Sequence, residues 1–204
     1  MSRKDEWIQT ASGDQFWPLD PRPEDTHIFD IASALSKLCR FGGHSNTFYS
    51  VAQHCCEGSV YIEKTVGDLD AAFAFLLHDA SEAYICDIPR PLKRLPEFAG
   101  YLEIEDNINK VIAQKFGIDF SNQLIWEVDD LMLATERKCF MPSNLDWGLK
   151  ALDYNLKAWS CATAFSKYST RFIMLSEKLS RTNRCYSAKQ TIRYRSTDQS
   201  DGNS

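Results

Sequence analysis

The segment LLHDASE, residues 76–82, places an imidazole and two carboxylates directly after the apolar run AAFAF. A buried ionisable group without a partner costs several kcal/mol, so His78 and Asp79 need compensation. Glu82 follows these residues by four and three positions, which places all three on one side of a helix. A structural hydrogen bond between His78 and Asp79 would provide that compensation, and so would a shared cation. Additional metal ligands elsewhere in the chain would favour the cation over the structural hydrogen bond.

Two other segments offer such ligands. His54, in YSVAQHC, lies on an apolar helix face, where a histidine on its own would be a core residue. Asp129, in IWEVDDLMLATER, has apolar residues three and four positions away, whereas Asp130 shares its face with Glu127 and Arg137. We therefore expect Asp129 to point inward. Two imidazoles and two carboxylates suit a divalent ion, which would be Co, Mn, Fe, Ni or Zn, or Mg where more water ligands remain.

The elements that must position these residues are helices. Apolar spacing and helix-start signals predict a bundle, with a short N-terminal strand or turn before it and a proline-broken loop, DIPRPLKRLPE, within it. The third expected helix, which contains AAFAFLLHDASE, is apolar on nearly every side, as expected for a core helix. The expected helices cover 31–38 up to the Gly42–Gly43 break, 51–64 capped by Ser50, a third from Gly67–Asp68 through residue 85, 100–115, 122–138 and 155–179.

Composition limits the organisation and the partners. A chain of 204 residues with 44% hydrophobic residues builds one core, which we place at 1–179, and the polar stretch 180–204 is expected to be a mobile tail or a contact to a neighbouring subunit. The net charge of −5 leaves no basic excess for a long nucleic acid or a membrane surface. No apolar segment has signal-peptide or bilayer-spanning length, so we expect a cytoplasmic protein.

Seven cysteines lie in the chain without any CxxC pair. Thiolate zinc sites normally show paired spacing, and disulfide frameworks are unusual in a cytoplasmic chain of this size. We interpret these residues as free thiols with packing roles. Cys55 and Cys56 differ from the other cysteines because they follow the candidate ligand His54 directly.

The candidate ligands also resemble a known signature. His54, then His78 and Asp79, then Asp129, each set on its own helix, is similar to the H…HD…D pattern of HD-domain metal-dependent phosphohydrolases across residues 28–140. The phrases CRFGGH, HDASEAY, DIPRPLK and LATER resemble a small phage and prophage branch that includes dATP triphosphohydrolases of phages with 2-aminoadenine DNA. The resemblance implies a compact all-α HD-domain bundle and a homo-oligomer, dimer or hexamer. It also implies the host cytoplasm if the chain is phage-encoded.

The resemblance assigns roles to these residues. His54, His78, Asp79 and Asp129 would hold the metal ion and leave positions open for water and a phosphate oxygen. Glu82 would act as general base and then as general acid; the alternative is a carboxylate that only orients His78.

Further residues would bind the substrate. Arg40 and Lys93 match basic positions of the branch and would contact phosphate oxygens. Phe41 and Pro91 would form a flat slot for the base, and His44 is a secondary phosphate candidate. Surface and turn roles are the alternative for Pro91 and Lys93. A further expectation, from spacing alone, is that Glu136 pairs with Arg40.

These roles imply hydrolysis of a small deoxynucleotide. We expect a dNTP triphosphohydrolase that releases deoxynucleoside and triphosphate, and the resemblance implies that dATP is the preferred substrate. The alternatives are a 5′-deoxynucleotidase acting on dNMPs, a phosphodiesterase for a cyclic or signalling nucleotide, and a metal-binding interaction protein without turnover. Two basic side chains beyond the metal suit a triphosphate better than a monophosphate.

Overall fold

The structure is a computed structural model that describes residue 3, residues 6–143 and residues 145–181. These residues form helices preceded by a small antiparallel hairpin in which Ile8 lies opposite Phe16, which confirms the predicted fold class. The elements are β1 (Ile8–Gln9), β2 (Gln15–Phe16), η1 (Pro23–Asp25), α1 (Ile28–Leu35), η2 (Arg40–Gly43), α2 (Val51–Thr65), α3 (Leu69–Leu77), α4 (Glu82–Ile85), α5 (Arg90–Lys93), η3 (Pro96–Phe98), α6 (Ala99–Phe116), α7 (Gln123–Phe140) and α8 (Cys161–Arg181).

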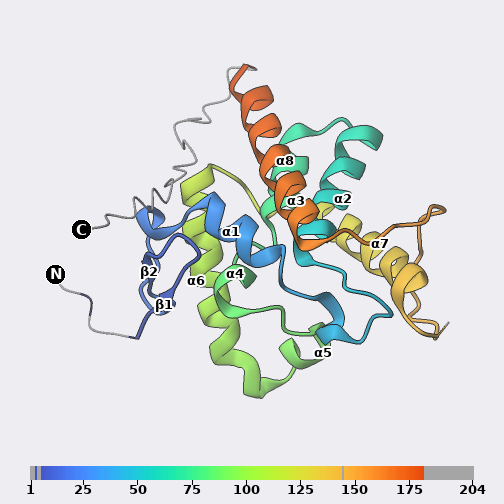
Figure 1. Cartoon of the computed structure of the whole chain (residues 1–204), viewed down its shortest axis with the longest axis horizontal. Coiled ribbons are helices and arrows are strands. Elements are labelled where there is room, and N and C mark those ends of the chain that lie inside the picture. The colour runs from blue at the N-terminus through green and yellow to red at the C-terminus, as the bar shows by residue number, and fades with distance from the viewer. Residues whose placement is uncertain (1–2, 4–5, 144, 182–204) are drawn as a thin grey trace, which may run out of the picture.

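Helices α2 and α3 form the centre of the bundle, and α8 packs against both (Figure 1). Gly58 on α2 faces Phe75 on α3, and a Cβ atom added at Gly58 would overlap the Phe75 ring. The close approach of α2 and α3 therefore requires glycine at position 58. It brings His54, one turn before Gly58, close to the end of α3.

Hydrogen bonds fasten α8 to this pair. The Tyr168 hydroxyl donates to the carbonyl oxygen of Leu76 at 2.8 Å, and Arg171 donates from Nε to the Ser59 hydroxyl at 3.0 Å. Helix α7 packs against α2 and α3 as well. The segment that carries Asp129 thus lies beside the segments that carry the two histidines.

The predicted starts of two helices are confirmed by their caps. The Ser50 hydroxyl accepts from the backbone N–H of Gln53 at 3.1 Å, and the Asp68 carboxylate accepts from that of Ala71 at 3.0 Å. Each cap satisfies a backbone donor that the first helical turn leaves unpaired.

The third helix is shorter than predicted, because α3 ends at Leu77 and α4 begins only at Glu82. The Nδ1–H of His78 donates to the carbonyl oxygen of Phe75 at 2.7 Å, and this oxygen is the one that the N–H of Asp79 would need in a continuing helix. The backbone switches instead to tighter i→i+3 bonds, as from Glu82 N–H to Asp79 C=O at 3.0 Å. Glu82 therefore does not share one helix with His78.

The boundaries of two other helices also differ from the predicted ones, because side-chain or backbone contacts interrupt the helix. Helix α1 ends at Leu35 rather than at 38, because the chain next pairs with the segment before α2 through Arg40 N–H to Tyr49 C=O at 2.9 Å. Helix α8 begins at Cys161 rather than near 155, because the side chain of Gln53 binds the backbone of Lys157 and Trp159 in a non-helical segment. The proline-broken loop contains the short helices α5 and η3.

The C-terminal end of the described chain bears on the predicted tail. Residues 180 and 181, which the sequence assigned to the tail, continue α8, and the rest of the predicted tail lies outside the described residues. The single domain over 1–179 stays a prediction. No helix in the described part of the chain combines the length and apolar character that crossing a membrane requires.

Candidate metal centre

Three buried side chains from three segments converge beside the α2–α3 contact. His54 comes from α2, His78 from the C-terminal end of α3 and Asp129 from α7, and their ligand atoms all lie within 4.8 Å of one another. Nε2 of His54 is 3.2 Å from Oδ1 of Asp129 and 3.4 Å from Nε2 of His78. Two imidazole nitrogens and a carboxylate oxygen at this spacing form a candidate site for a divalent metal ion.

Hydrogen bonds at the other ring nitrogen orient both histidines. Nδ1 of His54 is 2.6 Å from Oε1 of Glu136, and Nδ1 of His78 is 2.7 Å from the Phe75 carbonyl oxygen. Both partners are acceptors, so each Nδ1 carries the hydrogen and each Nε2 points toward the common space. Metal-binding histidines are typically held in this way, so the residues fit a metal ion.

Electrostatics in the cluster favour a cation. Burial and the charge of Arg40 lower the pKa of His54, but Glu136 and Asp129 outweigh them and raise it to about 9. Burial opposes ionisation of Asp129, yet hydrogen bonds from His54 and His78 hold its pKa well below the usual range. A proton on His54 and a bound divalent ion are therefore alternative ways to balance the same buried negative charge.

Asp79, the expected fourth ligand, lies at the edge of this cluster. Its Oδ1 is 3.3 Å from Nε2 of His78, and its Oδ2 is 3.6 Å from Nε2 of His54 and 3.4 Å from Nη1 of Arg40. Its side chain is 18% exposed, whereas that of His54 is fully buried. Asp79 thus adds negative charge on the more open side of the cluster.

The two aspartates of α7 have different surroundings, as the helix-face analysis predicted. Asp129 is buried, whereas the side chain of Asp130 is 47% exposed. Arg90 connects them, because its Nη2 donates to Oδ2 of Asp129 and its Nη1 to Oδ1 of Asp130, each at 2.6 Å. Arg90 was not among the residues predicted from the sequence. Its position three residues before Lys93 in the same basic loop was the available signal.

Glu82 is buried beside Lys93. The Lys93 ammonium lies 3.6 Å from Oε1 of Glu82 and 2.6 Å from Oε1 of Glu105, and Oε2 of Glu82 has no hydrogen-bond partner among the described residues. Burial and the charges of Asp79 and Asp87 raise the pKa of Glu82 well above the usual carboxyl range, against the opposing charge of Lys93. A buried carboxyl oxygen without a partner is unusual and points to a role in binding or proton transfer.

Arg40 is buried and has two carboxylate partners. Its Nε donates to Oε2 of Glu136 at 3.1 Å, which gives the pairing expected from spacing, and its Nη1 lies 3.4 Å from Oδ2 of Asp79. The Glu136 carboxylate also accepts from the Tyr49 hydroxyl at 2.9 Å. Glu136 thus joins Arg40 to the histidine cluster through its contact with His54.

The remaining predicted residues lie around Arg40 and Lys93. The Phe41 ring centroid is 5.6 Å from the Arg40 guanidinium carbon and 6.2 Å from the centroid of Trp147, and Phe41 has the left-handed backbone φ of 58°. His44 belongs to the same turn, where its N–H donates to the Phe41 carbonyl. Pro91 is exposed on α5. Substrate contacts of Phe41, Pro91 and His44 stay predictions.

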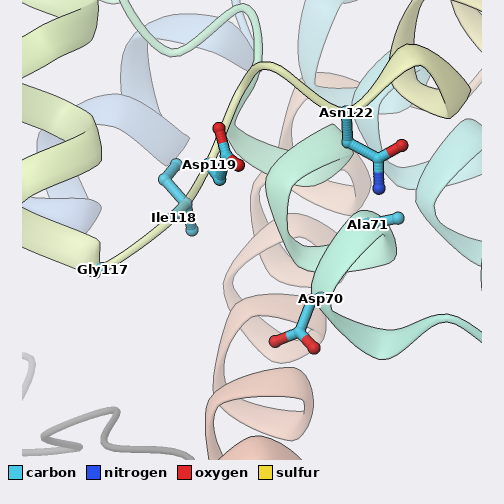
Figure 2. A pocket seen from close by; sticks show the side chains of 6 residues that line it. All are labelled: Asp70, Ala71, Gly117, Ile118, Asp119 and Asn122. Atoms are coloured by element: carbon cyan, nitrogen blue, oxygen red, sulfur yellow. The ribbon is translucent and has the colours of Figure 1, made fainter.

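A separate hollow lies away from this cluster. It is lined by residues at the start of α3, the end of α6 and the turn before α7, namely Asp70, Ala71, Gly117, Ile118, Asp119 and Asn122 (Figure 2). None of them is basic or a histidine, and the carboxylates of Asp70 and Asp119 point in different directions. Asp119 and Asn122 also accept backbone N–H groups in their own turn. The hollow therefore suits neither a phosphate nor the predicted metal.

Comparison with known proteins gives two similar chains. The chain is 37% identical to the uncharacterized protein YfdR of Escherichia coli over 178 residues, which cover 84% of this chain and 96% of YfdR. It is 32% identical to the uncharacterized protein RCAP_rcc00048 of Rhodobacter capsulatus over 120 residues, 55% of this chain and 59% of that protein. No family model matches the chain.

Proposed function

The chain belongs to the protein family of Escherichia coli YfdR, and we propose that it is a metal-dependent phosphohydrolase of the HD-domain type that acts on deoxynucleotides. The observation that carries the proposal is the convergence of His54, His78 and Asp129. Asp79 contacts this group and Arg40, and the neighbouring pair of Glu82 and Lys93 supplies a buried carboxyl and a cation of the kinds that a phosphohydrolase needs.

His54, His78, Asp79 and Asp129 would hold the ion, each from a backbone position fixed by helix packing. A divalent ion bound there supplies Lewis acidity toward a phosphate and toward water. Glu136 and the Phe75 carbonyl keep the two imidazoles oriented, so that Nε2 of each is free to bind the ion. Arg90 holds Oδ2 of Asp129 and leaves Oδ1 toward the histidines.

Glu82 is the proposed proton carrier. Burial and the charges of Asp79 and Asp87 raise the pKa of Glu82, which makes its carboxylate a stronger base than an exposed one. Attack by water at the α-phosphorus forms a P–O bond and breaks the bond to the 5′-oxygen of the deoxynucleoside. Glu82 accepts the proton of the attacking water at its unpaired Oε2 and returns a proton to the leaving oxygen.

Arg40 and Lys93 are the proposed phosphate contacts, and they favour a triphosphate substrate, with dATP preferred from the resemblance. The guanidinium of Arg40 is oriented by Glu136 and Asp79, and the ammonium of Lys93 by Glu105 and Glu82. Preoriented cations bind phosphate oxygens without further loss of side-chain freedom.

A 5′-deoxynucleotidase is the second candidate. The contacts that orient Arg40 and Lys93 also neutralise much of their charge, which favours the smaller monophosphate. Product analysis of all dNTPs and dNMPs with Mn²⁺ or Co²⁺ tests the choice. Deoxyadenosine and intact triphosphate from dATP support the first candidate, whereas faster turnover of dAMP than of dATP supports the second.

A further inference from the structure

A second group of potential metal ligands shares His78 with the first. The ligand atoms of Cys55, His78 and Asp79 all lie within 4.8 Å of one another. Cys55 follows His54 directly on α2, and its side chain is fully buried. Successive residues of a helix are about 100° apart, so His54 and Cys55 approach His78 from two directions.

The two groups cannot both hold an ion through His78. Nδ1 of His78 carries the hydrogen that it donates to the Phe75 carbonyl, so Nε2 is the one nitrogen left to bind a metal. An ion held with Cys55 and Asp79 therefore takes His78 away from the group formed with His54 and Asp129. Occupation of the two groups is mutually exclusive.

The two groups also differ in the ions that they prefer. Sulfur is a soft ligand that selects ions such as Zn²⁺ or Cd²⁺, whereas Mn²⁺ and Mg²⁺ prefer oxygen with some nitrogen. A thiolate, an imidazole and a carboxylate form a set of the kind that binds zinc. Mn²⁺ therefore gains little from Cys55, and a soft ion gains a strong ligand.

We propose that Cys55, His78 and Asp79 form a site for thiophilic divalent ions, which excludes the ion of the His54–His78–Asp129 group by occupying His78. Binding forms one sulfur–metal bond and breaks the S–H bond of Cys55, and the thiol proton passes to solvent. Thiophilic ions are then inhibitors of the proposed hydrolase. Only this inhibition rests on the proposed function, because binding at Cys55 does not require turnover.

The test measures cadmium binding in a background that removes other accessible thiols. In this background Cys39 and Cys139, which are partly exposed, Cys86 and Cys161, which are exposed, and Cys185, which lies outside the described residues, are changed to serine. One equivalent of Cd²⁺ should produce the ultraviolet thiolate-to-cadmium band. Cys55→Ser should abolish the band and lower the affinity for Cd²⁺ relative to Mn²⁺ at least about tenfold.

Cys56→Ser is the matched control, because Cys56 is the next residue on α2, is also buried, and does not belong to the ligand group. It should keep both the band and the affinity ratio. A band that persists in Cys55→Ser, or no band in the background protein at saturating Cd²⁺, would overturn the proposal. Cadmium-113 NMR of the background protein gives the same answer if Cys55→Ser does not fold, since one sulfur ligand shifts the resonance strongly.

Different results would contradict the proposed function and the proposed thiophilic site. Absence of Mn²⁺-dependent turnover of any deoxynucleotide contradicts the hydrolase and leaves the cadmium band as evidence for the second site. Turnover that Cd²⁺ inhibits equally in Cys55→Ser and Cys56→Ser contradicts exclusion through Cys55 and leaves the hydrolase standing.

Discussion

Glu136 joins Arg40, Tyr49 and the histidine cluster through a single carboxylate. This fully buried carboxylate contacts Nδ1 of His54 and the Tyr49 hydroxyl through Oε1, and it accepts from Nε of Arg40 through Oε2. It therefore fixes the ring of His54 and balances the charge of Arg40 at the same time. The sequence suggested only the contact to Arg40, because spacing along α7 cannot show that His54 reaches the same carboxylate.

Glu136→Gln should weaken Mn²⁺ binding by about 10- to 100-fold, the usual effect of losing a partner that orients a ligand. The amide keeps the shape of the side chain but removes the charge that stabilises His54 and Arg40. Calorimetric titration with Mn²⁺ measures the change. Tyr49→Phe removes only a hydroxyl from Glu136 and is the control, with affinity close to that of the unmodified protein. Equal affinities in all three proteins would exclude the orienting role.

Glu82→Gln should lower kcat by roughly 10²- to 10⁴-fold while the metal stays bound, because the change removes the base and keeps the shape. Steady-state kinetics with dATP and metal analysis of the same sample provide the two readings. Loss of the metal would show that Glu82 is structural. A near-normal kcat would remove it from the mechanism.

Sequence reasoning at the level of single residues worked where one helix face decided the outcome. Asp129 was chosen over Asp130 from apolar neighbours three and four positions away, and Asp129 is the buried one. Arg90 and the approach of Cys55 to His78 depend on how separate segments meet. No spacing within one segment carries that information.

At the scale of the elements, the contact between α2 and α3 positions the two histidines. Gly58→Ala should destabilise the protein by about 1–3 kcal/mol, because a methyl group at this position overlaps the Phe75 ring in a packed core. Urea unfolding measures the difference. Gly100→Ala on α6 is the control, since a Cβ atom there has open space, and it should stabilise by about 0.5–1 kcal/mol. A stabilising Gly58→Ala would mean that the helices are not in close contact.

The two helix starts with side-chain caps were predictable, whereas the end of α3 and the start of α8 were not. Ser50 and Asp68 cap helices through local hydrogen bonds that sequence patterns record. The end of α3 depends on the ring of His78, which occupies the Phe75 carbonyl, and the start of α8 depends on Gln53. Such contacts of a side chain with a distant or competing backbone group override the apolar periodicity that predicted longer helices.

At the scale of the whole molecule, the proposed site takes residues from η2, α2, α3, α4, α5, α6 and α7. Lys93 on α5 is held by Glu105 of α6 and faces Glu82 of α4, so its position depends on the whole bundle. The helical class and the convergence of His54, His78 and Asp129 followed from the sequence, because apolar helix faces show which side chains point inward. The role of Asp79 as a fourth ligand stays a proposal. Substrate, oligomer and partners did not follow from it and stay proposals.

Lys93→Ala should lower kcat/KM for dATP. The loss should correspond to about 1–3 kcal/mol of transition-state stabilisation, the contribution of a charge-assisted hydrogen bond to a phosphate. The loss should be smaller for dAMP, which has no β- or γ-phosphate to contact. Kinetics with both substrates measure the difference, and Lys110→Ala, which removes an exposed lysine of α6, is the control. Equal losses on dATP and dAMP would favour the 5′-deoxynucleotidase.

The most direct test of the metal centre is the anomalous X-ray difference map of crystals grown with Mn²⁺. We expect a peak within coordination distance of Nε2 of His54, Nε2 of His78 and Oδ1 of Asp129, the atoms that already face one another. The same peak should be lost in crystals of Asp129→Asn. An empty cluster at saturating Mn²⁺, or a peak confined to the hollow at Asp70 and Asp119, would contradict the account.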